Sequence, residues 1–493
     1  MTKNWNPKYV QYVLEPHFVQ AKQHFFAPLL EVSRAHALML WQVGLLESDH
    51  TKKILAALEV VQHEEFAYAQ QFEDLFFALE FRLTELAGAE AAGNLHIARS
   101  RNDLDAALIR MVLREATLKH CAVLGQLCTI LQTRALDGVT WLMPGYTHHQ
   151  PAQPTTLGHY LCGVLHTLQR DLKRLEAAYQ CINCSPLGAV AMTGTGFPIN
   201  RQAMADWLGF DAVLENATDA VGAADHSLEL LSVVQISNVT VSRLLHDLIF
   251  WTAQETGFLR VADEFVQISS IMPQKRNPVV LEHIRAKLAR SSGAAQSAFG
   301  IVGNIPFGDV NDVAEPLLPV TLAALDDSRA ALELLGQVII HSSFDTKKMR
   351  LAASQHFITT TGLADALLST GLSFRQAHHI VSKTIDLAVQ RGLDTADITA
   401  ELVRQASSVP IKIDDAFVQK ALDPQEFVAR RTTFGGSAAE TVHIALEQAG
   451  QKLAQAGAWR EQQQDNLWAA QQKLEQASQS ADFSRPQQSN TRR

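Results

Sequence analysis

The spacing of apolar residues along the chain predicts long helices in its central part. Over residues 103–135, apolar side chains recur every three or four positions without a proline, as they do along one face of a helix. Similar runs cover residues 156–179 and 223–256. The last run is apolar on nearly every side, and such a helix must be covered on every side. We therefore expect a bundle of long helices that associates with further copies of the chain.

Shorter helices are expected on both sides of the long ones. Residues 1–102 contain short amphipathic runs separated by turns. Residues 351–460 contain another set of short runs, which Pro410 and Pro424 interrupt. Residues 461–493 are rich in Gln, Ser and charged residues, which predicts a polar and partly disordered tail.

These patterns predict an all-α fold with three helical domains, the central one covering residues 103–350. Asp103 is the expected N-cap of the first long helix. Residues 138–154 are rich in Gly and Pro and predict a block of turns rather than regular structure. No alternating strand pattern of useful length occurs in the sequence.

Charge and cysteine usage exclude several classes of protein. The 493 residues carry a net charge of -9, which gives no electrostatic basis for binding nucleic acid or an acidic membrane. Five cysteines are an odd number and widely spaced, so we expect reduced thiols and no disulfide framework. Cys181 and Cys184 form a single CxxC without a second pair, so we expect no metal site.

The most apolar stretch, residues 226–251, contains Glu229, Arg243 and Asp247, which makes a membrane span a poor interpretation. The first ten residues lack the apolar core of a secretion signal. We therefore expect a cytoplasmic protein.

Residues 269–278, SSIMPQKRNP, are the strongest candidate for chemistry. Pro273 and Pro278 resist helix formation, so the segment predicts a loop that leads into a helix. Hydroxyl groups beside cations on a loop suit proton abstraction near an anion. By composition alone, a basic surface loop is the better interpretation of the segment.

Two further segments change that balance. Residues 96–103 read HIARSRND, and residues 143–154 read MPGYTHHQPAQP. With SSIMPQKRNP, they resemble the argininosuccinate lyase family of the fumarase and aspartase superfamily, whose members eliminate fumarate from substituted succinates. The resemblance implies three helical domains, no cofactor, and a homotetramer with a central bundle. It also implies active sites that each draw on three chains.

The resemblance assigns roles to matching residues. Ser269 matches the serine base that removes the Cβ proton, and its environment must lower its pKa for this task. Lys275 matches the cation that stabilises the carbanion and favours an ionised Ser269. Asn277 matches a position that binds a substrate carboxylate.

A second group of residues matches the acid side of the reaction and the carboxylate contacts. His148 matches a histidine that passes a proton to the departing nitrogen, and Glu282 matches the carboxylate paired with it. Thr147, Arg101 and Asn102 match positions that hold the carboxylates of the substrate.

The chain departs from the family pattern mainly where the family binds the arginine end of its substrate. By alignment, the following residues replace the family's serine, aspartate, histidine, tyrosine, glutamine and lysine: Phe18, Lys22, Phe76, Pro306, Asn311 and Ala314. His149 stands where the family usually has an apolar residue. We take Lys22 and Asn311 as candidate contacts to the leaving amine.

The sequence thus predicts a carbon–nitrogen lyase that releases fumarate from a small-molecule N-succinyl amine through an aci-carboxylate intermediate. Lys22 would attract a leaving amine with its own carboxylate, which favours an aminocarboxylic N-succinate. The alternatives are a genuine argininosuccinate lyase, and a catalytically silent structural protein like the lens crystallins of this superfamily.

Overall fold

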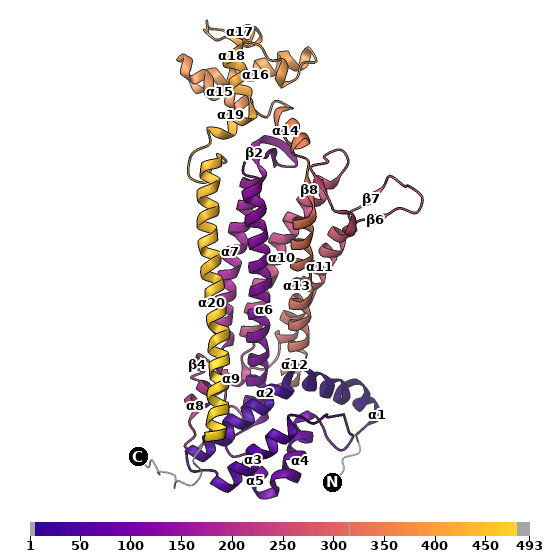
Figure 1. Ribbon diagram of the computed structural model, residues 1–493, viewed down its shortest axis with the longest axis vertical. Helices are drawn as coiled ribbons and strands as arrows, with labels where there is room; N and C mark the ends of the chain where they lie inside the picture. The colour runs from indigo at the N-terminus through magenta and orange to yellow at the C-terminus, as the bar shows by residue number, and fades with distance from the viewer. Residues whose placement is uncertain (1–4, 315, 481–493) are drawn as a thin grey trace.

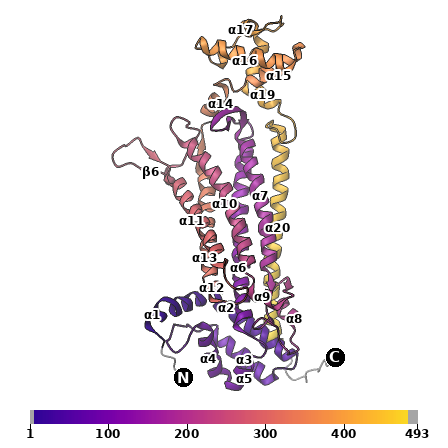
Figure 2. The ribbon, with the colours of Figure 1, turned by 180° about the vertical axis from the view of Figure 1, so that it is seen from behind.

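The computed structural model describes residues 5–314 and 316–480 (Figure 1). In this part of the chain, six long helices run side by side and form an elongated bundle (Figures 1 and 2). They are α6 (Arg101–Asp137), α7 (Leu157–Ile182), α10 (Asp225–Thr252), α11 (Val279–Val302), α13 (Leu317–His341) and α20 (Ala439–Ser480). The prediction of an all-α fold built on long central helices is confirmed.

Further helices, most of them shorter, cover both ends of the bundle (Figure 1). At the N-terminal end lie α1 (Pro7–Tyr9), a π-helical turn (Val10–Leu14), α2 (Glu15–Gln42), α3 (Ser48–Val61), α4 (Leu75–Ala87), α5 (Ala89–Asn94), α8 (Arg201–Trp207), α9 (Ala217–Gly222) and α12 (Asn311–Ala314). At the other end lie α14 (Thr346–Ser354), α15 (Thr360–Leu367), α16 (Phe374–Gln390), α17 (Ala400–Ala406), α18 (Asp415–Leu422) and α19 (Pro424–Ala429). Single 3₁₀ turns occur at Asp263–Phe265, Leu368–Thr370 and Thr395–Asp397. The 28-residue α2 is longer than the short helices expected for this region.

The described strands form four two-stranded pairs. They are β1 (Leu142–Thr147) with β2 (Gln150–Thr156), β3 (Cys184–Ser185) with β4 (Ala212–Val213), β5 (Leu259–Arg260) with β8 (Ser343–Phe344), and β6 (Gln267–Ile268) with β7 (Arg276–Asn277). The β1–β2 hairpin corrects the expectation of turns over residues 138–154. Pro144 and Pro154 face each other in this hairpin and interrupt the alternating pattern that would have predicted strands. A two-stranded ribbon tolerates these prolines because each strand has a free edge.

Helix α10 packs against α7, α11 and α13 within the bundle (Figure 1). Asn238 on α10 donates to Ser291 Oγ on α11 at 2.8 Å and accepts from Ser328 Oγ on α13 at 2.7 Å. All three side chains are buried, so this network fixes the positions of the three helices relative to one another along the bundle axis. By length and composition, α10 is the one helix among those described that could cross a membrane. Half of its most apolar 18-residue stretch is buried inside the molecule.

Helix α20 corrects the expected limits of the last domain and the tail. Gln132 on α6 and Gln169 on α7 donate to the carbonyls of Leu446 and Ala449 at 2.9 Å and 2.7 Å. Residues 439–480 therefore belong to the bundle rather than to a small domain ending at 460. The sequence does not reveal that α20 belongs to the bundle, because the helix is largely polar and is held partly by hydrogen bonds to its backbone. Residues 481–493 of the expected tail lie outside the described residues.

The start of α6 depends on a capping box. Ser100 is the N-cap, and Asp103, the expected N-cap, occupies the third helical position. The buried Asp103 carboxylate accepts the N–H groups of Ser100 at 3.1 Å, Gly188 at 2.8 Å and Val190 at 3.0 Å. Burial raises the pKa of Asp103, and these three bonds lower it. One side chain thus fixes the helix start and the loop that contains Gly188 and Val190.

We predict that Asp103→Ala lowers the free energy of unfolding by about 3 kcal/mol or more, because three N–H donors lose their acceptor at about 1–3 kcal/mol for each one left unsatisfied. Asp137→Ala, at the exposed end of the same helix, should change it by less than about 0.5 kcal/mol. Urea denaturation followed by circular dichroism, at one protein concentration, measures both values. Equal stabilities would contradict this role of Asp103.

Candidate active site

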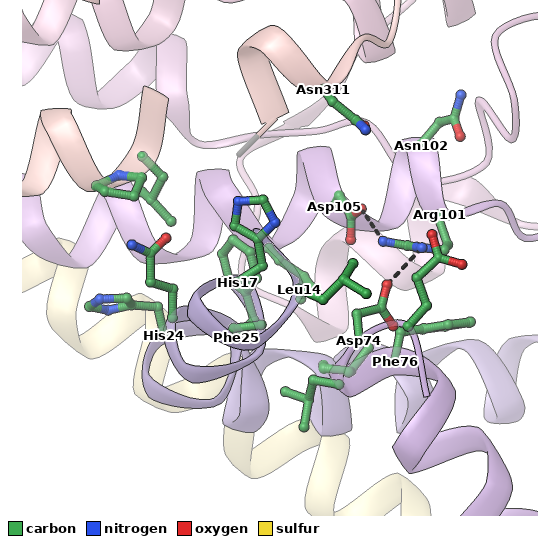
Figure 3. Close-up of a pocket in the computed structure, with 18 of the residues that line it drawn as sticks. Leu14, His17, His24, Phe25, Asp74, Phe76, Arg101, Asn102, Asp105 and Asn311 are labelled. Carbon is green, nitrogen blue, oxygen red and sulfur yellow. Dashed lines mark ion pairs between the residues drawn. The ribbon is translucent and has the colours of Figure 1, made fainter. Parts of the chain in front are cut away.

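A cavity of about 320 Å³ lies at the N-terminal end of the bundle, where α2, α4 and the first turns of α6 meet (Figure 3). Arg101 and Asn102, the first two residues of α6, line this cavity together with Asn311 of α12. The structure therefore brings together three of the residues that the sequence assigned to substrate binding.

The Arg101 guanidinium is held on two sides (Figure 3). Its Nη1 lies 2.7 Å from Asp74 Oδ2, and its Nη2 lies 3.8 Å from Asp105 Oδ2. The rings of Phe76 and Phe77 lie 5.8 Å and 5.7 Å from its central carbon, within the range of a cation–π interaction. These contacts restrict the side chain and leave 41% of its surface exposed, an arrangement that would suit the binding of a carboxylate.

A second group of candidate residues lies at the opposite end of α6. Thr147 ends β1 and Gln150 begins β2, so His148 and His149 form the two-residue turn between them. Both histidines have positive φ, 52° and 59°, a conformation that residues other than glycine, asparagine and aspartate rarely adopt. Thr147 and both histidines line a cavity of about 870 Å³.

The third group lies on the loop between β6 and β7, which projects from the side of the bundle (Figure 1). The N–H groups of Ile271 and Met272 donate to Ser269 Oγ at 3.3 Å and 3.0 Å. Two donors aimed at this oxygen favour an alkoxide over a hydroxyl group. Lys275 lies on the same loop and is exposed, as is Ile271, which has 86% of its surface exposed.

Arg276 anchors the base of this loop. It forms an ion pair with Asp263 and donates from Nη2 to the carbonyl of Val261 at 3.1 Å. Asn277 follows at the half-buried end of β7, and Glu282 lies exposed in the first turn of α11. The two ends of the loop are thus fixed, while its tip is exposed to solvent in a single chain.

Comparison with known proteins identifies this combination of bundle and loops. The model of the Lyase family matches residues 17–293, and the model of the argininosuccinate lyase C-terminal family matches residues 357–429. The chain belongs to the argininosuccinate lyase family. Membership makes it a carbon–nitrogen lyase that releases fumarate.

Individual relatives cover most of the chain. Argininosuccinate lyase 1 of Shouchella clausii is 36% identical over 453 residues, which are 90% of this chain and 91% of the relative. Argininosuccinate lyase of Thermus thermophilus is 39% identical over 428 residues, 85% and 91% of the two chains. Among solved structures, EDDS lyase in complex with formate is 29% identical with a TM-score of 0.86, covering 97% of this chain and 96% of its own. A variant of EDDS lyase with bound fumarate superposes with a TM-score of 0.85.

The positions that depart from the argininosuccinate lyase pattern do not all reach the cavity at the start of α6. Lys22 does not line it, because Lys22 Nζ pairs with Glu65 Oε2 at 2.6 Å. Phe18 is buried with its ring against Tyr68, at a centroid distance of 5.7 Å. Lys22 therefore lies outside this cavity of the single chain, and its contact with the leaving amine stays a prediction. Phe76 and Asn311 do line the cavity.

Sequence reasoning missed three polar residues of α2 that line the same cavity: His17, Gln20 and His24. They recur at intervals of three and four residues, which places them on one face of the helix. That spacing was the available signal, but the alignment drew attention to Phe18 and Lys22 on other faces.

The cavity is acidic. Its lining has one guanidinium, that of Arg101, and four carboxylates, those of Glu73, Asp74, Asp105 and Asp309. Burial raises the pKa of Asp105 to about 7, Arg101 lowers it, and the nearby carboxylates of Asp74 and Asp309 raise it. Asp105 therefore carries only part of a negative charge near neutral pH, while the other three add to an electrostatic preference for a cationic ligand group.

One chain does not bring the three groups of site residues together. The 37 residues of α6, at about 1.5 Å each, separate Arg101 from the hairpin that carries His148 by about 55 Å. The loop with Ser269 and the exposed Glu282 lie near the hairpin end of the bundle, far from Arg101 (Figure 1).

Proposed function

We propose that this member of the argininosuccinate lyase family works as a homotetramer and eliminates fumarate from an N-succinyl amine in the cytoplasm. Ser269 removes a proton from Cβ of the succinyl group, which leaves a dianionic aci-carboxylate. The electrons then reform the carboxylate and a carbon–carbon double bond as the carbon–nitrogen bond breaks. His148, supported by Glu282, donates a proton to the departing nitrogen.

The surroundings of Ser269 support its role as the base. A free hydroxyl is far too weak for this proton, so the charged form of Ser269 needs stabilisation. The N–H groups of Ile271 and Met272 already donate to its oxygen. Lys275 on the same loop adds a positive charge that favours both the alkoxide and the aci-carboxylate. No cofactor takes part in this scheme.

The remaining site residues hold the two carboxylates of the succinyl group. Arg101 offers a planar guanidinium suited to a bidentate contact, and Asn102, Thr147 and Asn277 offer neutral polar groups. The fumarate bound to a variant of EDDS lyase supports a fumarate site in this fold.

The observation that carries the proposal is the separation of about 55 Å between Arg101 and His148 along α6. A rigid helix cannot bring its two ends to one substrate, so the residues must come from different chains. Exposed apolar side chains on α10 support such an assembly, since Ile236 and Val239 leave 44% and 55% of their surface open in a single chain.

We predict that Ser269→Ala lowers kcat by about 100-fold to 10,000-fold with little change in substrate binding, the range that general bases contribute. Ser270→Ala, at the exposed neighbouring position, is the matched control and should retain activity. The absorbance of released fumarate measures both. Near-normal turnover by Ser269→Ala would remove this residue from the mechanism.

We also predict that two inactive variants, His148→Asn and Ser269→Ala, restore activity to each other when refolded together. If each site takes these residues from different chains, roughly one quarter of the sites in a random mixture combine both native residues. Each variant refolded alone is the control. Mixed tetramers, verified by mass spectrometry, that remain inactive would show that one chain supplies both residues.

The leaving amine that the acidic cavity favours carries a positive charge. Glu73 and Asp309 have no counterpart cation among the described residues lining this cavity. They would repel a leaving amine with an extra carboxylate, the substrate that Lys22 had favoured. Argininosuccinate has a cationic leaving group, and the names of the relatives support it.

An aminocarboxylic N-succinate remains the second candidate. It is favoured by the loss of polar groups at Phe18, Phe76 and Pro306, positions where the family binds the arginine end. A site that loses such a contact forfeits about 1–3 kcal/mol for each substrate group left unsatisfied.

We predict a higher kcat/KM for argininosuccinate than for an N-succinyl amine bearing an additional carboxylate. Asp309→Asn should reduce this preference by about threefold to tenfold, because it removes one carboxylate near the cation. Lys22→Asp should leave the preference unchanged if the acidic cavity, and not Lys22, sets it. The opposite preference would restore the aminocarboxylic substrate, and no fumarate from either would favour a silent structural protein.

A further inference from the structure

The turn that carries His148 is docked on α10 by two aromatic contacts, one on each side. The rings of Tyr146 and Phe250 lie 5.5 Å apart at an interplanar angle of 86°. The rings of His149 and His246 lie 5.9 Å apart at 64°. Phe250 and His246 are four residues apart and therefore lie on one face of α10. Between the two contacts lie Thr147 and His148.

The geometry of the turn requires such support. His148 and His149 both adopt left-handed backbone conformations, which cost roughly 1–2 kcal/mol for each residue with a side chain. A two-residue turn of this kind normally uses Asn and Gly. The register of β1 and β2 also shifts between Gly145 and Tyr146, just before the turn. The hairpin sequence alone therefore does not favour the conformation that places His148.

The face of α10 that receives the turn is itself fixed. Tyr160 of α7 donates a hydrogen bond to Asp247, and its ring lies 5.1 Å from that of Trp251. Asp247 and Trp251 are the neighbours of His246 and Phe250 in sequence. The two rings that hold the hairpin thus project from a segment of α10 that α7 already holds in place.

We propose that His149 and His246 form a positioning pair, which holds the strained turn on α10 and so orients His148 toward the departing nitrogen. The pair rests on the proposed function of His148. Neither residue contacts the reacting atoms in this scheme. His149 takes the place of the apolar residue usual in the family, so the pair gives this chain its own way of holding the turn.

The test compares His246→Ala with His246→Phe. Removing the ring should lower kcat by about tenfold to hundredfold with KM changed less than about twofold, because a displacement near 1 Å of a catalytic group has effects of that size. His246→Phe keeps a ring for His149 and should restore kcat to within about threefold of the native value. His379→Ala, at an exposed position on α16, is the matched control and should change neither constant.

Hydrogen exchange supplies a readout that needs no turnover. The amides of residues 146–150 should exchange faster in His246→Ala, and at the native rate in His246→Phe, with the tetramer and its melting temperature unchanged. An unchanged kcat and native exchange in His246→Ala would overturn the pair, as would a phenylalanine variant as impaired as the alanine one. Native protein that releases no fumarate from any N-succinyl amine would refute the proposed function instead, and the exchange rates would still decide whether the pair holds the turn.

Discussion

The length of α6 is the constraint on which the rest of the site depends. Its 37 residues form one unbroken helix that begins at Arg101 and ends just before the β1–β2 hairpin. Arg101 and Asn102 therefore stand at one end of a rigid rod, and Thr147 and His148 stand at the other. If both ends serve the proposed reaction, parts of other chains have to complete the site at each end, and the proposed catalysis then requires assembly.

The interior of the bundle explains how such distant parts can be placed accurately. An apolar helix can slide along its neighbours with little loss, because apolar contacts have no direction. The buried hydrogen bonds among Asn238, Ser291 and Ser328 are directional. They fix the positions of α10, α11 and α13 along the bundle axis. The loop with Ser269 joins α10 to α11, so its two roots are fixed although its tip is exposed.

The sequence predicted the parts of the fold that depend on apolar periodicity. It missed the parts that depend on directional hydrogen bonds and on which face of a helix a side chain occupies. The long helices were evident, since burial of one face requires the pattern. The place of helix α20 in the bundle was not evident, because the bonds that hold it run from Gln132 and Gln169 to its backbone. Lys22 was assigned to the site from alignment alone, and on its helix it lies roughly 140° around from His17, at about 100° per residue, so the two do not line the same cavity. Three motifs drew attention to the candidate catalytic segments, and the resemblance implied sites shared between chains, but no local pattern showed that one chain holds these segments far apart.

The turn at His148 shows why a candidate catalytic residue can contradict local sequence preference. Glycine at this position would relieve the backbone strain, but it would remove the imidazole that the proposed proton transfer needs. Asparagine at the second position would suit the turn, yet it has no ring to contact α10. If the proposed proton transfer requires His148 at this position, the turn stays strained. The energy that stabilises its conformation then has to come from contacts outside the hairpin. A helix already fixed by α7 is the element best placed to supply that energy.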